Sequence, residues 1–139
     1  MIEFHSEVDF NIEDEERYRD WMMRVASTEG YEIGDINYIF CDDEYLHELN
    51  LKYLEHDTFT DIISFDYTVG DLLQGDIFIS VERVRDNASR YDVEFDEELK
   101  RVMVHGILHY CGYKDKSEKE AGIMRAKEEE KLLLFHVEQ

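Results

Sequence analysis

The chain has 139 residues, 43% apolar and 13% aromatic, which excludes a disordered chain and is enough for one domain with a hydrophobic core. Its 35 acidic and 15 basic residues give a formal charge of −20, so strong nonspecific binding to nucleic acid is not expected. A specific RNA site would need a local basic patch or a bound cation. Two isolated cysteines and the lack of a signal peptide or an apolar run of about 20 residues predict a cytoplasmic protein without a membrane segment.

Apolar residues recur with the period of strands and helices in alternating segments. In chain order we predict a strand over residues 2–10, a helix over 12–30, a strand over 35–41, a helix over 43–55, a strand over 62–67, a loop over 68–75, a strand over 76–80, and helices over 81–91, 97–112 and from 117 onward. Gly30 is a predicted helix stop, Asp42 a predicted cap, and Ser117 with Glu120 a predicted capping box. The order indicates an α+β (α/β) fold, a single domain over residues 1–139 with a roughly four-stranded mixed sheet and about five helices.

The segment "HGILHYCGYKD", residues 105–115, carries the first chemical signal. His105 and His109 are four residues apart, so on a helix they share a face and are able to meet one ion. Gly112 suits a left-handed helix end that turns the chain back and brings Asp115 toward the same ion. Three protein ligands with an open position are typical of catalytic zinc. We therefore predict one Zn²⁺ per chain, and the alternative is a histidine pair that occurs by chance on an amphipathic helix.

The metzincin proteases have a related pattern, HExxHxxGxx(H/D). Here Gly106 stands where those proteases have their glutamate base. The ligands without that base argue against peptidase chemistry and leave a hydrolytic metal centre with a different base.

The whole segment resembles the YbeY family of metal-dependent endoribonucleases, whose pattern is HGxLHxxGYDH. The resemblance extends upstream, where "LNLKYLEHDTFTDIISF" is similar to LNxxYRxxDxPTDVLSF, and "GDIFIS" to a GDI strand. Downstream, Ala121, Met124 and Glu128 resemble the spacing of the terminal helix. These motifs occur in the family's order and cover about residues 46–130.

Three departures from the family pattern bear on activity. The family's Asp-His is Lys114-Asp115, so the third ligand is expected to be a carboxylate. Phe59 replaces a proline, and Leu54 stands where the family usually has an arginine implicated in catalysis. Leucine cannot hold a phosphate, and the loss removes a charge-assisted hydrogen bond worth about 1.5–3 kcal/mol. Cations that are candidates to replace it are Lys52, His56, Lys114 and Lys116.

The resemblance implies single-strand-specific cleavage of RNA in the maturation of the 3′ end of 16S rRNA, and a role in ribosome quality control. It implies the small ribosomal subunit, a ribosomal protein and a ribosome-associated GTPase as partners, with neither DNA nor a membrane. On the same basis the metal ligands are His105, His109 and Asp115. Candidate substrate-binding residues are Asn50, Ser64 and Lys114. The resemblance assigns no proton carrier to this chain, and Asp61, Asp66 and Asp76 are candidates because they lie near predicted strand ends.

Two other functions are compatible with the sequence. A non-catalytic ribosome-assembly factor, stabilised by its metal and bound to ribosomal proteins, is favoured by Leu54. A general metallohydrolase for small phosphates or amides is the weaker alternative.

Overall fold

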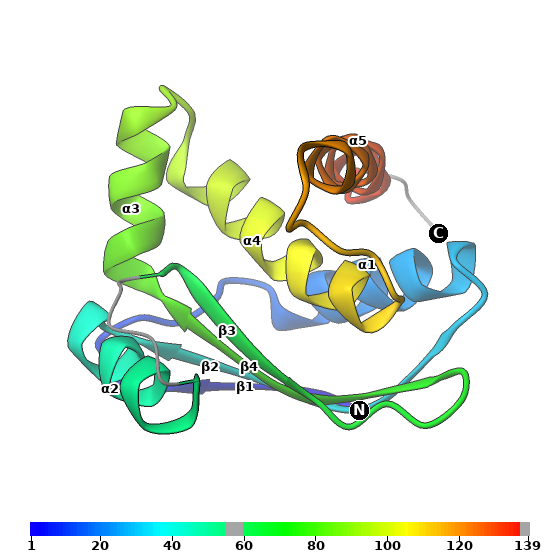
Figure 1. Cartoon of the computed structure of the whole chain (residues 1–139), viewed down its shortest axis with the longest axis horizontal. Helices are drawn as coiled ribbons and strands as arrows, with labels where there is room; N and C mark the ends of the chain where they lie inside the picture. The colour runs from blue at the N-terminus through cyan, green and yellow to red at the C-terminus, as the bar shows by residue number, and fades with distance from the viewer. Residues whose placement is uncertain (55–59, 137–139) are drawn as a thin grey trace.

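The computed structural model describes residues 1–54 and 60–136. These residues form one sheet and five helices (Figure 1). The elements in order are β1 (Ile2–Ser6), α1 (Glu15–Thr28), β2 (Glu32–Cys41), α2 (Asp43–Leu54), β3 (Ile62–Asp66), β4 (Leu72–Ser80), α3 (Val81–Arg90), α4 (Phe95–Tyr110) and α5 (Glu118–Leu134). The predicted α+β fold, with a four-stranded mixed sheet and five helices, is confirmed.

The strands lie in the order β1-β2-β4-β3. The first three are mutually parallel, and β3 runs antiparallel to β4 at one edge. Successive side chains of a strand point to opposite faces. On β4, Ile77 and Ile79 therefore enter the main core, while Phe78 packs with Leu46 of α2 on the other face. Helices α1, α4 and α5 lie together on the main-core side, and α2 lies on the opposite side (Figure 1).

Helix α4 is the central helix of the core. Leu99, Met103 and Ile107 are buried against the sheet and its neighbours, and the Tyr38 hydroxyl donates a hydrogen bond to the Met103 carbonyl at 2.8 Å. Gly106 is at the closest approach to the sheet, because a Cβ there would lie 3.0 Å from the Ile77 side chain. The opposite side of α4, which carries the two histidines of the motif, is left partly exposed.

Several sequence predictions of element bounds were wrong: α1 begins at Glu15 rather than at residue 12, and β2 begins at Glu32 rather than at residue 35. The first strand ends at Ser6 rather than at residue 10, because a tight turn follows in which the Phe10 amide donates to the Val8 carbonyl at 2.8 Å. The loop predicted over 68–75 is shorter, because β4 already begins at Leu72, which pairs with Glu32 of β2. Pairing with a neighbouring strand decided this boundary, which the turn-like sequence concealed.

The predicted caps are confirmed. Gly30 has φ +82° just beyond α1, and Asp42 accepts a hydrogen bond from the Tyr45 amide at 2.8 Å. Ser117 and Glu120 form the capping box, with bonds of 3.0 and 3.1 Å. The predicted end of the second helix, at residue 55, lies outside the described residues, as do His56, Asp57 and Phe59. Within the described part of the chain, the helices are too short or too polar to cross a membrane.

Candidate metal centre

The end of α4 is built as the sequence predicted. Gly112 has φ +98°, a left-handed conformation that suits glycine. The Gly112 amide donates to the His109 carbonyl at 3.0 Å, and the Tyr113 amide donates to the Leu108 carbonyl at 3.1 Å. These two bonds form a Schellman motif, which satisfies the last carbonyls of the helix and reverses the chain. The reversal brings Asp115 back beside the two histidines.

Three ligand atoms converge at this point, all within 4.8 Å of one another. The Nε2 atoms of His105 and His109 are 2.9 Å apart, and Asp115 Oδ2 lies 3.2 Å from the first and 3.4 Å from the second. Ligands placed tetrahedrally at 2.0–2.1 Å from a zinc ion are about 3.3 Å apart. The triangle therefore has the size that one small divalent cation requires.

The hydrogen bonds of the two rings show that this donor set fits a metal. His105 Nδ1 lies 2.6 Å from Glu128 Oε2, and His109 Nδ1 lies 2.9 Å from the Tyr113 carbonyl oxygen. Both partners are acceptors, so each Nδ1 carries the ring proton and each Nε2 presents a lone pair. Two lone pairs and a carboxylate oxygen then face one another within 3.4 Å, an arrangement that a shared cation stabilises.

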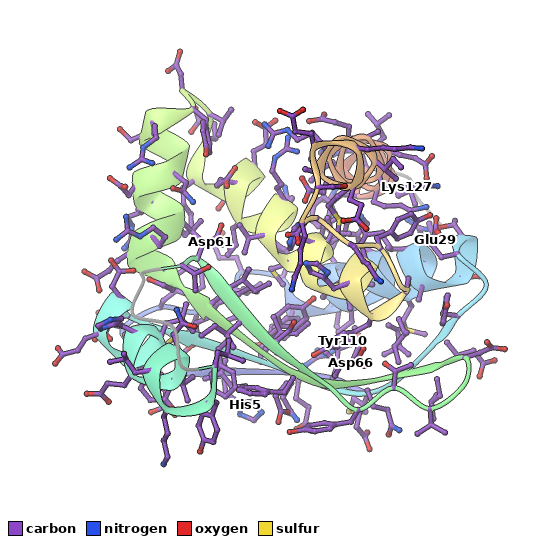
Figure 2. All side chains as sticks on the ribbon, in the orientation of Figure 1. His5, Glu29, Asp61, Asp66, Tyr110 and Lys127 are labelled. Carbon is purple, nitrogen blue, oxygen red and sulfur yellow. The ribbon has the colours of Figure 1, made fainter. Side chains whose placement is uncertain are left out.

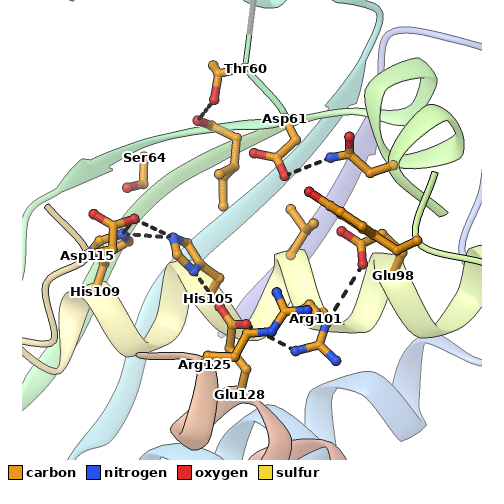
Figure 3. A pocket seen from close by; sticks show the side chains of 14 residues that line it. Thr60, Asp61, Ser64, Glu98, Arg101, His105, His109, Asp115, Arg125 and Glu128 are labelled. Carbon is orange, nitrogen blue, oxygen red and sulfur yellow. Dashed lines mark hydrogen bonds and ion pairs between the residues drawn. The ribbon is translucent and has the colours of Figure 1, made fainter. Parts of the chain in front are cut away.

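A second layer of side chains fixes the ligands (Figure 3). Glu128, which is only 5% exposed, holds His105 and is itself held by Arg101 at 3.2 Å. Burial acts to lower the pKa of His105, but the hydrogen bond and charge of Glu128, aided by Asp115, outweigh it and raise that pKa above its usual value. A carboxylate in this position also makes the imidazole a stronger metal ligand.

The second histidine is anchored through Tyr113. The Tyr113 carbonyl accepts a hydrogen bond from His109 Nδ1, and the Tyr113 hydroxyl donates one to Glu29 Oε1 at 2.6 Å. Glu29 lies just past the end of α1, and it also pairs with Lys127 and Lys131 of α5, at 3.3 and 2.7 Å. Figure 2 shows Glu29 and Lys127 on neighbouring parts of the molecule. The turn that carries Asp115 is thus tied to both α1 and α5.

The three candidate ligands lie at the edge of a cleft of about 360 Å³. Besides them, the described residues that line it are Thr60, Asp61, Ile62, Ser64, Asn87, Tyr91, Glu98, Arg101, Val102, Arg125 and Glu128. Ser64 enters the cleft because it alternates with Ile63 and Phe65, which pack on the other face of β3. Of the three residues that the sequence suggested for substrate binding, only Ser64 is among these lining residues.

The other candidates lie elsewhere. Asn50 is buried on α2, and Lys114 is exposed beyond the end of α4. Asp66 accepts from the Thr68 amide at 2.9 Å in a turn, at the far end of β3 from Asp61 (Figure 2). Asp76 accepts from Asn37 at 3.1 Å. None of these four is among the described residues that line the cleft.

Asp61 is the one proton-carrier candidate that faces the cleft. Burial raises the pKa of its carboxyl above the usual value, and the neighbouring charge of His105 opposes this rise. Asn87 Nδ2 donates to its Oδ2 at 3.4 Å. Asp61 directly precedes β3, so the edge strand places it opposite α4.

Two arginines of the cleft, Arg101 and Arg125, and the contact of Glu128 with His105 were not predicted from the sequence. The substitutes considered for the family arginine were lysines and a histidine. Lys52, Lys114 and Lys116 are exposed and lie outside the lining of the cleft, and His56 is outside the described residues. The sequence did hold one indication of Arg125. It precedes Glu128, which matches the spacing of the family's terminal helix, by three residues and therefore shares its helix face.

Comparisons with known proteins identify the family of the chain. The family model described as Endoribonuclease YbeY matches residues 2–136. Proteins named Endoribonuclease YbeY are similar at 61% identity in Flavobacterium johnsoniae, over 100% of both chains, and at 62% in Christiangramia forsetii, over 99% of this chain and 96% of that one. A solution structure from Thermotoga maritima covers 97% of this chain and 89% of its own, with a TM-score of 0.69 and 24% identity, which supports the fold. The chain belongs to the YbeY family of endoribonucleases.

Proposed function

We propose that this protein is a zinc-dependent, single-strand-specific endoribonuclease that acts in the cytoplasm on the 3′ end of 16S rRNA and in ribosome quality control. The observation that carries the metal dependence is the convergence of His105 Nε2, His109 Nε2 and Asp115 Oδ2 within 3.4 Å, with both Nδ1 atoms held by acceptors. Family membership supports RNA as the substrate.

The proposed reaction is hydrolysis of a phosphodiester, in which a water oxygen bonds to phosphorus and the bond to the leaving ribose oxygen breaks. Zn²⁺, when bound by the three ligands, supplies Lewis acidity to a phosphoryl oxygen and lowers the pKa of water. Glu128 and the Tyr113 carbonyl keep the two imidazoles oriented throughout.

Two residues of the cleft have proposed roles beside the ligands. Asp61 faces the site from the start of β3 and is the proposed proton carrier for the attacking water or the leaving oxygen. Ser64 lies three residues further along the chain, on the face of β3 that lines the cleft, and its hydroxyl is a proposed hydrogen-bond partner of the substrate.

The experiment compares cleavage of a single-stranded fragment spanning the 16S rRNA 3′ end with cleavage of the same fragment annealed to its complement. The zinc-loaded wild type is expected to cut only the single strand, and His109→Ala to cut neither. His5→Ala, which alters an exposed histidine on β1, is the matched control and keeps activity. Equal cleavage by wild type and His109→Ala would refute a metal-dependent nuclease.

A second candidate function is a metal-stabilised ribosome-assembly factor that binds ribosomal proteins and a ribosome-associated GTPase. Leu54, which is 43% exposed, stands where the family pattern has an arginine. This difference favours the assembly factor. It predicts no cleavage by the wild type and undiminished co-sedimentation of His109→Ala with small subunits.

A further inference from the structure

The cleft beside the three ligands is strongly acidic. Its lining carboxylates are Asp61, Glu98, Asp115 and Glu128, and its lining cations besides the histidines are Arg101 and Arg125. An RNA phosphate entering this cleft is repelled by the carboxylates, on a chain whose formal charge is −20. The position of the two guanidinium groups therefore decides whether an anion is able to reach the ligands.

Arg101 is committed to the protein itself. Its guanidinium lies 3.2 Å from Glu128, 2.6 Å from Glu129 and 3.8 Å from Glu98, and its side chain is 14% exposed. Three carboxylates surround its charge, and Glu128 and Glu129 each accept a hydrogen bond from it. Arg101 is thus a positioning residue that holds Glu128 against His105.

Arg125 is in the opposite situation. It is exposed, and within residues 1–54 and 60–136 it makes no hydrogen bond or ion pair. It lines the main cleft and also an adjoining hollow of about 270 Å³, which shares His105, Asp115 and Glu128 with the cleft. Its guanidinium is therefore available beside the ligands, on the α5 side of the cleft (Figure 3).

We propose that Arg125 binds a phosphate of the RNA substrate and so supplies the cation that the Leu54 position lacks in this chain. This inference rests on RNA being the substrate. A guanidinium presents a planar fork of donors that matches two phosphate oxygens, and the described residues take up none of the Arg125 donors in a hydrogen bond. Of the cations that the sequence suggested as substitutes for the family arginine, the described ones are Lys52, Lys114 and Lys116, and all three lie outside the cleft.

The test measures binding separately from cleavage. A fluorescent single-stranded oligoribonucleotide is titrated, at several salt concentrations, into His109→Ala protein and into the same protein with Arg125→Gln, Arg125→Lys or Lys119→Gln. Lys119 is an exposed cation on the same helix outside the cleft, so its variant is matched in charge. We expect Arg125→Gln to weaken binding about tenfold, which corresponds to 1.4 kcal/mol, and to flatten the slope of log K against log salt by about 0.7.

The controls separate charge from geometry. Arg125→Lys is expected to restore the salt slope but only part of the affinity, because lysine keeps the charge without the fork. Lys119→Gln is expected to bind with the affinity and slope of the parent. If Arg125→Gln also binds like the parent, or if Lys119→Gln weakens binding equally, the inference is overturned.

Cleavage assays with His109 intact, on the wild type and on Arg125→Gln, then distinguish this inference from the proposed function. Arg125-dependent binding without any cleavage by zinc-loaded wild type would leave the inference standing and refute the nuclease. Cleavage by wild type with an unchanged KM in Arg125→Gln would refute the inference and leave the nuclease standing. We expect cleavage, with a KM raised about tenfold in the variant.

Discussion

Glu128 is the residue through which α5 contacts the candidate metal centre. Its Oε2 accepts the Nδ1 proton of His105 at 2.6 Å, which leaves Nε2 free for the ion and fixes the plane of the ring. Replacing it with glutamine keeps the size of the side chain but removes the negative charge, and the amide is able to present a donor to Nδ1 as readily as an acceptor. The expected effect of Glu128→Gln is therefore a weaker metal site.

The magnitude follows from the geometry. Loss of a carboxylate that orients a metal-bound histidine typically lowers metal affinity 10- to 100-fold, or about 1.4–2.7 kcal/mol. The upper part of that range applies here, because Glu128 is 5% exposed and water does not easily replace it. Arg101 loses one carboxylate partner but retains Glu129 at 2.6 Å. We therefore expect the unfolding free energy of the apoprotein to fall by about 1–3 kcal/mol.

The assay is competition for Zn²⁺ between the protein and a chromophoric chelator at neutral pH, with urea denaturation of the apoprotein as the second measurement. Glu129→Gln is the matched control. It removes the same charge from the neighbouring position and also breaks an ion pair with Arg101, but Glu129 is 60% exposed and makes no bond to His105. The control is expected to keep wild-type zinc affinity and to lose less than about 1 kcal/mol of stability.

The reasoning fails if Glu128→Gln binds zinc as tightly as the wild type does. It fails equally if Glu129→Gln weakens zinc binding to the same extent, because the effect would then come from the charge of α5 rather than from the bond to His105.

Three further predictions concern other parts of the molecule. Asp115→Asn removes the one anionic ligand and is expected to lower Zn²⁺ affinity about tenfold or more in equilibrium dialysis, so an unchanged metal content would contradict the assignment. Gly75→Ala puts a Cβ 2.3 Å from a carbonyl oxygen of β3 and is expected to cost about 1–3 kcal/mol in urea denaturation, whereas Gly122→Ala, with open space on a helix, is expected to stabilise. Burial acts to raise the pKa of Glu29, but the hydrogen bonds from Lys131 and Tyr113 outweigh it and lower that pKa from its ordinary 4.5. Since the folded pKa is the lower one, Glu29 stabilises the fold above pH 4.5 and loses this contribution as the pH falls through its folded pKa. Urea denaturation should show wild type and Glu29→Gln converging at acid pH, and a constant gap from pH 7 to 3 would be inconsistent with this.

Neighbours in the sequence made the centre of the site predictable. His105 and His109 are one helical turn apart, Gly112 has the left-handed conformation that ends the helix, and Asp115 follows on the returning chain. Each of these relations spans ten residues or fewer, so helix geometry and turn chemistry determine them without the rest of the fold. The same holds for the capping box at Ser117, which fixes where α5 begins.

Contacts between distant segments decided what surrounds the ligands. The edge position of β3 and its antiparallel register with β4 put Ser64 and Asp61 in the cleft, and no local pattern distinguished them from Asn50 or Asp66. The start of β4 at Leu72 was likewise set by pairing with β2, because a short segment with turn residues has no strand pattern of its own.

The sequence by itself determined the fold class, the helix caps and the grouping of His105, His109 and Asp115, because periodicity and capping are properties of short segments. Only the tertiary structure decided which charges face the ion and the cleft. It placed Glu128 against His105, tied Arg101 to three carboxylates and left Arg125 at the cleft with no hydrogen bond or ion pair to the described residues. The physical reason is that the angle at which α5 packs on α4 is set by the whole core, and that packing selects which face of a highly charged helix meets the site.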